Sequence, residues 1–221
     1  MIKALFYREW LKTRMAAIIA AALMVCGTAY SLVNSFQMLR LHGAAQVWND
    51  MATGNTPILP AAITWLPLLA ALLVALAQFV PEMTDSRLKL TLHLPLQPGT
   101  ALAVLLGYGC TVIVSAYVLS CALLAAGLSA GFPREITAMA LAGILPHMLG
   151  GLCAYFLAAW ICLEKRWRQR TAYTAIAATL CVPFYAIPAP EAAVTVSLAV
   201  LAAVCSLFPY YSMAQFREGA Q

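Results

Sequence analysis

The sequence predicts an all-α, polytopic integral membrane protein of one domain, with six transmembrane helices. Of its 221 residues, 63% are hydrophobic and only 10% are charged, whereas about a quarter of the residues of a soluble domain are charged. Apolar segments of about 20 residues take up nearly the whole length, and each can cross a hydrocarbon core about 30 Å thick. Lysine and arginine are concentrated in alternate loops, which is typical of a chain that crosses a membrane repeatedly. Such a chain has no room for a soluble catalytic domain.

The six apolar segments are expected to be helices, because lipid cannot satisfy the polar groups of an open backbone. The fifth segment is short and contains Pro183, with Pro188 and Pro190 just beyond it, so its end is either a helix or a broken, re-entrant turn. Residues 1–14 are expected to form an interfacial helix before the first span. The predicted domain therefore covers residues 1–221, with spans at 15–36, 61–80, 100–128, 138–163, 172–187 and 192–213.

The longest connection between spans, residues 37–60, has a helical pattern of its own. Its apolar residues recur at every third or fourth position, which places them on one face of a helix. They are Met38, Leu41, Ala45, Trp48 and Met51. The connection is therefore either an outer interfacial helix or an extension of the first span.

The basic residues predict the orientation. If the amino terminus lies in the cytosol, all thirteen lysines and arginines except Arg40 and Arg134 lie on the cytosolic side. Basic residues favour that side in short loops. We therefore expect both termini in the cytosol and the chain in the cytoplasmic (inner) membrane of a bacterium.

The predicted spans carry no acidic residue, lysine or arginine. Transporters driven by protons or sodium usually hold an ionisable group near the midplane, and His147 is the one histidine inside a span. A buried, neutral histidine that bonds to a neighbouring helix is the more common arrangement, and a functional relay is the alternative. The chain also lacks the GxxxxGK[ST] loop that binds nucleotide phosphates. If the protein moves a cargo, a separate motor subunit is implied.

Two further patterns resemble chemical sites. The seven cysteines lie in apolar runs without a CxxC pair or a histidine at ligand spacing, so we interpret them as packing residues and expect no metal or other cofactor on this chain. Residues 127–131 match the GxSxG pattern of serine hydrolases, which requires a strand, a turn and a helix. Here the pattern closes an apolar helix, and His147 lies about 15 Å deeper than Ser129 at 1.5 Å per residue. We favour a GxxxG face for helix packing, and a plain turn is the alternative.

The amino-terminal segment carries the first part of a family resemblance. Tyr7 and Trp10 suit the level of the lipid headgroups, and Arg8 and Lys12 share one helix face. Together with Phe6, they resemble the short basic and aromatic helix that precedes the first span in type-2 ABC exporter permeases. Glu9 falls among the apolar positions of this helix, so a simple cluster of charges next to the membrane is the alternative.

The loop at 81–95 carries the second part. It begins with acidic residues, has a leucine-rich middle and ends in Leu94-Pro95 before the third span, as in that family. The resemblance implies a coupling helix from Glu82 to Leu94 that docks on an ATPase. Strict alternation of the leucines favours a strand, however, and Asp85-Ser86 stands where the family often has Gly-Thr. The implied coupling residues are Glu82, Asp85, Arg87, Leu88, Lys89, Leu90 and Leu92.

By this resemblance the chain is a permease half of an ATP-driven exporter and not itself an enzyme. It would pair with itself or with a second permease, lie in membrane lipid, and work with two ATPase subunits that bind ATP and Mg²⁺; no nucleic acid partner is expected. The uncharged polar side chains of Tyr108, Thr111 and Ser115 would line a path or a dimer face, although helix packing also explains them. The alternatives are a non-transporting assembly or immunity factor and, less favoured, an intramembrane enzyme.

Overall fold

The computed structural model describes residues 2–53, 60–84, 98–164, 166–186 and 192–218. These residues form α-helices and no strand, which confirms the predicted all-α class. The helices are α1 (Ile2–His42), α2 (Ala44–Ala52), α3 (Ala61–Thr84), α5 (Pro98–Ser129), α6 (Arg134–Leu163), α7 (Trp167–Ala186), α8 (Ala192–Cys205) and α9 (Phe208–Glu218).

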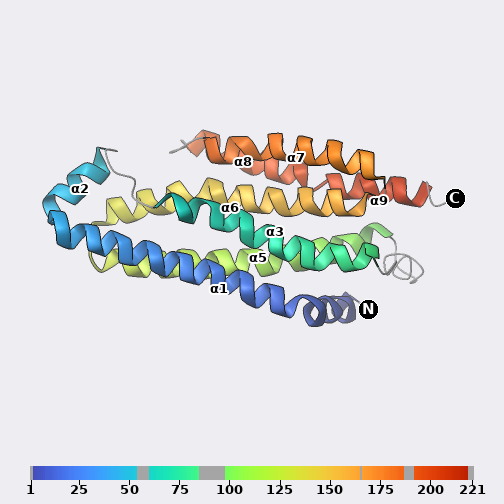
Figure 1. The fold of residues 1–221 in the computed structure, drawn as a ribbon, viewed down its shortest axis with the longest axis horizontal. Helices are drawn as coiled ribbons and strands as arrows, with labels where there is room; N and C mark the ends of the chain where they lie inside the picture. Colours follow the sequence, from blue (N-terminus) through green and yellow to red (C-terminus); the bar gives the residue numbers. More distant parts are fainter. Residues whose placement is uncertain (1, 54–59, 85–97, 165, 187–191, 219–221) are drawn as a thin grey trace.

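The helices form one elongated bundle (Figure 1). The chain runs up and down its long axis, with α1, α5 and α7 running one way and α3, α6 and the pair α8–α9 running the other. Both termini therefore lie at the same end, which we call the terminal end, and α2 lies at the opposite, distal end. α6 is the central helix, because it contacts α2, α3, α5, α7, α8 and α9.

Among the described residues, five helical segments are long and apolar enough to cross a membrane: Lys3–His42, Ile63–Met83, Gly99–Ser129, Arg134–Leu163 and Ala192–Met213. They match five of the six predicted spans, so the prediction of a multispanning membrane protein is confirmed in this coarser form. α7 matches the remaining one in position but does not qualify as a span. Its first turn contains Arg168 and Arg170, and Ala and Thr dominate its middle.

The predicted interfacial helix and the first span are one continuous helix. α1 has 41 residues and would be about 60 Å long at 1.5 Å per residue, twice the thickness of a hydrocarbon core. Its first turns, next to the label N in Figure 1, are seen almost along their own axis, whereas the rest of α1 follows the long axis of the bundle. The first turns therefore lie across the bundle axis.

At the distal end, the first span is extended, as one alternative for the long connection predicted, and a separate short helix, α2, follows it. α1 extends the first span to His42, and Gly43, with φ of 79°, then turns the chain into α2. This φ lies in the left-handed region that glycine adopts without a steric penalty. Val47 and Met51 of α2 are buried in a cluster with residues of α5 and α6, whereas Leu41 is exposed.

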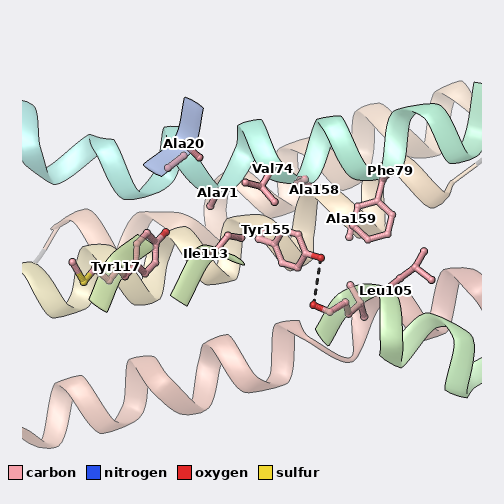
Figure 2. Close-up of a cluster of buried hydrophobic side chains, with 14 of the residues drawn as sticks. Ala20, Ala71, Val74, Phe79, Leu105, Ile113, Tyr117, Tyr155, Ala158 and Ala159 are labelled. Atoms are coloured by element: carbon pink, nitrogen blue, oxygen red, sulfur yellow. Dashed lines mark hydrogen bonds between the residues drawn. The ribbon is translucent and has the colours of Figure 1, made fainter. Parts of the chain in front are cut away.

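The main core lies between α1, α3, α5 and α6 (Figure 2). Alanines such as Ala71, Ala158 and Ala159 let the helix backbones approach closely, and the space between them is filled by Phe79 and Tyr155. Small interface residues matter here because the hydrophobic effect does not hold helices together within lipid.

The GxxxG pattern is a packing face, as favoured from the sequence. A Cβ atom on Gly127 would lie 2.5 Å from Leu32 Cδ1, and one on Gly131 would lie 2.6 Å from Phe36 Cε1. Gly127 therefore lets α5 approach α1 closely, and Gly131, in the turn after α5, lets the chain approach the next turn of α1. Ser129 is exposed and donates its hydroxyl hydrogen bond to the Ala126 carbonyl of its own helix, at 2.9 Å.

Candidate functional site

Four charged residues meet at the terminal end of the bundle, between α1 and α3. They are Arg8, Glu9 and Lys12 of α1 and Glu82 of α3, and we call them the charged junction. The two carboxylates are almost completely buried, with side-chain exposures of 0% for Glu9 and 1% for Glu82, and Lys12 is 13% exposed. Charged side chains are rarely buried to this extent without partners.

Lys12 is the centre of the charged junction. Its Nζ atom lies 2.8 Å from Glu9 Oε2 and 2.8 Å from Glu82 Oε1. Arg8, which is half-exposed, places Nη2 3.2 Å from Glu9 Oε1 and 3.4 Å from Glu82 Oε1. Two cations thus face two carboxylates, and the pairs that include Glu82 join residues more than 65 positions apart in the sequence.

The helical repeat of α1 explains this arrangement. The buried residues Leu5, Glu9, Thr13 and Ala17 follow each other at intervals of four, which is one face of a helix. Glu9, which interrupts the apolar pattern in the sequence, therefore points into the bundle. Lys12 lies three residues further along α1 and can reach Glu9 from the same side.

A second layer of polar contacts lies directly beneath the charged junction. Thr13 donates to the Glu9 carbonyl at 2.9 Å, so the Tyr108 hydroxyl of α5, 2.6 Å from Thr13 Oγ1, is the donor in that contact. The Tyr108 ring meets Phe6 edge to face, with ring centroids 4.9 Å apart. These contacts join the first turns of α1 to α5.

A third layer joins α3, α5 and α6. Gln78 donates to the Leu105 carbonyl at 2.8 Å and accepts from the Tyr155 hydroxyl at 2.8 Å. The same hydroxyl lies 3.4 Å from the Leu106 carbonyl, the contact shown as a dashed line in Figure 2. Gly109 makes room for this pair, since a Cβ atom there would overlap the Tyr155 hydroxyl and lie 2.7 Å from Gln78 Oε1. Hydrogen bonds of this kind hold helices together where water is absent.

The structure brings together some of the residues predicted from the sequence and separates others. Arg8, Lys12 and Glu82 meet in the charged junction, and Phe6 packs on α5, whereas Tyr7 and Trp10 are exposed on another face of α1. The remaining predicted coupling residues lie outside the described residues. They are Asp85, Arg87, Leu88, Lys89, Leu90 and Leu92.

The predicted path or dimer face on α5 is divided. Tyr108 is buried between α1 and α5, whereas Thr111 and Ser115 are exposed. Both exposed hydroxyls donate to carbonyls of their own helix, at 2.7 and 2.8 Å. The three side chains therefore do not form one polar surface.

Sequence reasoning did not select Glu9, Thr13, Gln78 or Tyr155 as site residues. Two signals could have found them. Glu9 shares the buried spacing of α1, and Gln78 is an amide within the apolar run 61–80. A polar side chain at such a position is expected to bond to a neighbouring helix.

A separate apolar cavity of about 590 Å³ lies between α3, α6 and α7. Trp65 of α3 stacks on Tyr185 of α7 at this cavity, with ring centroids 4.7 Å apart and planes 2° from parallel. Leu72, Leu157 and Cys181 are among its other lining residues, and no lining residue is charged.

The turn between α6 and α7, at the terminal end, is held by Arg170. Its Nε donates to the Glu164 carbonyl at 2.6 Å and its Nη2 donates to the Cys162 carbonyl at 3.2 Å. A basic residue that caps the last carbonyls of a helix also interacts favourably with the helix dipole. Arg166 and Arg168 remain exposed in this turn.

His147 lies in α6, where its Nδ1 atom is 3.0 Å from the Gly143 carbonyl and its ring meets Tyr185 edge to face. In the part of the chain that the structure describes, no three histidine, cysteine or acidic side chains are arranged to hold a metal ion. No protein-family model matches the sequence, and neither the curated proteins nor the solved structures contain a significant match.

Proposed function

We propose that the chain is the transmembrane permease half of an ATP-driven ABC exporter, with the terminal end of the bundle in the cytosol of a bacterium. ATP and Mg²⁺ are then bound by separate ATPase subunits. The family resemblance of the first turns of α1 and of the loop at 81–95 motivates this proposal. The charged junction is the observation that supports it best, because it joins these two segments directly.

Transmission of force requires a rigid connection between the loop that a motor contacts and the helices that move. Glu82 lies in the last turn of α3, which continues to Thr84 into the segment predicted as the 81–95 loop, and it is paired with Lys12 and Arg8 of α1. A push on this loop would therefore displace α1 and α3 together. The two polar layers beneath the junction extend the same connection to α5 and α6.

A six-span topology is part of the proposal. α7 runs antiparallel to α6 along the long axis, and both termini lie at one end of the bundle (Figure 1). An even number of crossings is needed to return the chain to the side where it began. With five candidate spans described, α7 supplies the sixth, and Arg168 and Arg170 stay at its cytosolic end.

Co-purification from the native membrane tests the proposal. We expect the tagged, intact chain, solubilised in a mild detergent, to carry a second copy or a second permease together with an ABC-type ATPase, and to hydrolyse ATP in a vanadate-sensitive reaction. If chain that keeps its fold never associates with an ATPase, the proposal is wrong, and the chain is better explained as an assembly or immunity factor.

Charge reversal tests the coupling loop more finely. We expect the double variant R87E/K89E to lose ATPase association or stimulation. The matched control is Arg134→Glu, a basic residue at the distal start of α6, which should keep both. If R87E/K89E keeps ATPase association and activity as the control does, Arg87 and Lys89 determine only the orientation of the chain.

A further inference from the structure

The first turns of α1 have a second face that the charged junction does not use. Lys3, Tyr7, Trp10 and Arg14 follow each other at intervals of four, three and four, so they lie on one side of the helix. All four are exposed, Tyr7 by 63% and Trp10 by 44%. We call these four residues the basic-aromatic face.

The positive charge of this face is not neutralised within the described part of the chain. Arg8 and Lys12, on the neighbouring side of the same turns, pair with Glu9 and Glu82. Neither Lys3 nor Arg14 forms an ion pair with a described carboxylate. The face therefore offers two uncompensated cations to an anionic partner.

A surface cavity of about 380 Å³ accompanies these charges and is lined by Lys3, Phe6, Tyr7 and Trp10. The Phe6 ring is held by its edge-to-face contact with Tyr108, so one wall of the cavity is fixed by the bundle. The cavity combines one cation with three aromatic rings. A ligand that fits it has both an anionic and an apolar part.

The direction of these turns suits a membrane surface. They lie across the long axis of the bundle (Figure 1), whereas the spans cross the membrane along that axis. These turns therefore run along a membrane surface, next to the beginning of the first span. Tyr and Trp favour this interfacial level, and Lys and Arg there attract anionic headgroups.

We propose that the basic-aromatic face is a binding site for an anionic phospholipid. Lys3 and Arg14 contact the phosphate-bearing headgroup, and the cavity formed with Phe6, Tyr7 and Trp10 receives the glycerol and the first methylene groups. An acidic protein surface would match the charges but not the aromatic cavity at membrane level. Lipid binding does not require a motor subunit, so it can be tested independently of transport.

Native mass spectrometry of the purified full chain can measure this binding. The chain in detergent is titrated with phosphatidylglycerol or with phosphatidylcholine, and the first bound lipid is counted. Each basic residue near an anionic lipid changes affinity by about fivefold. We expect K3Q/R14Q to bind phosphatidylglycerol about 25-fold more weakly and phosphatidylcholine unchanged, and Trp10→Ala to weaken both lipids.

The matched control is R166Q/R168Q, which removes two exposed arginines from the turn between α6 and α7 at the same end of the bundle. It should leave the first phosphatidylglycerol bound with unchanged affinity. An equal loss in this control would show that only net charge acts, and would overturn the site. Equal affinity of the unchanged chain for the two lipids would also overturn it and would favour an acidic protein as the partner of this face.

Discussion

Removing the Lys12 ammonium group should destabilise the protein strongly. In Lys12→Met the two buried carboxylates lose the cation that lies 2.8 Å from each of them. Removing one partner of a buried ion pair costs about 3–5 kcal/mol, because a charge is left uncompensated in a dry environment. Arg8 stays within 3.4 Å of both carboxylates and should offset part of this, so we expect the lower end, about 3 kcal/mol.

The variant Glu82→Gln shows how much of this free-energy cost comes from the Lys12–Glu82 pair. In Glu82→Gln, Lys12 keeps Glu9, and the expected cost is only about 1–2 kcal/mol. With Glu82 already neutral, Lys12→Met leaves one carboxylate facing Arg8, so the second substitution should cost about 1 kcal/mol instead of about 3. The expected coupling energy between Lys12 and Glu82 is therefore about 2 kcal/mol.

Reversible denaturant unfolding of the purified chain in detergent, followed by tryptophan fluorescence, gives these free energies. Arg168→Met is the control, because it removes an exposed cation outside the charged junction, and its unfolding midpoint should not move. The electrostatic reasoning is refuted if Lys12→Met behaves like Arg168→Met. It is also refuted if the costs of Lys12→Met and Glu82→Gln add to within about 0.5 kcal/mol, since independent sites are additive to that extent.

Three further outcomes are expected. Gly109→Ala should cost about 1–3 kcal/mol of unfolding free energy, because its methyl group overlaps the Tyr155–Gln78 contact. The control Gly107→Ala should cost nothing, because no atom beyond its own stretch of helix lies within 4 Å of the added group. Equal costs for the two variants would contradict this packing. Gln78→Leu should cost about 1–3 kcal/mol because it removes the hydrogen bonds to the Leu105 carbonyl and from the Tyr155 hydroxyl, which keeps only its 3.4 Å contact with the Leu106 carbonyl. Adding Tyr155→Phe should restore part of that loss in the same unfolding assay. A reporter fused after Gln221 should be active in the cytosol, and an extracytoplasmic signal would contradict the orientation.

The length of the apolar runs was enough to predict the helical class and most of the spans. The fifth predicted span is not among the five candidate spans described, because α7 has Arg168 and Arg170 in its first turn and is rich in Ala and Thr. Its antiparallel position in the bundle became visible only in three dimensions (Figure 1). Local composition does not report which helices a segment packs against.

The candidate site was predicted only in part, because helical spacing does not show which side chains at the border of a helix face turn into the bundle. Tyr108, Thr111 and Ser115 lie close together around α5 by spacing alone, but the long Tyr108 side chain bends inward to Thr13. Similarly, Glu9 interrupts an amphipathic pattern in the sequence. Its buried charge is compensated by Arg8 and Lys12 of the same helix, and Glu82 reaches these two cations only after α1 and α3 pack. The pairing of distant charges cannot be read from either segment alone.

Burying charged side chains in the charged junction costs desolvation free energy, so stability alone does not explain it. An apolar contact of similar volume is often as stable as a buried ion pair or more so, and the core around Phe79 and Tyr155 shows that this bundle packs well without charges. The ion pairs instead hold α1 to α3, because Lys12 Nζ lies 2.8 Å from a carboxylate oxygen on each of the two helices. Under the proposed permease function, such a junction would let α1 and α3 move together when a motor subunit pushes the adjoining loop. The contact of Thr13 with Tyr108 and those of Gln78 with Leu105 and Tyr155 would then extend that displacement to α5 and α6.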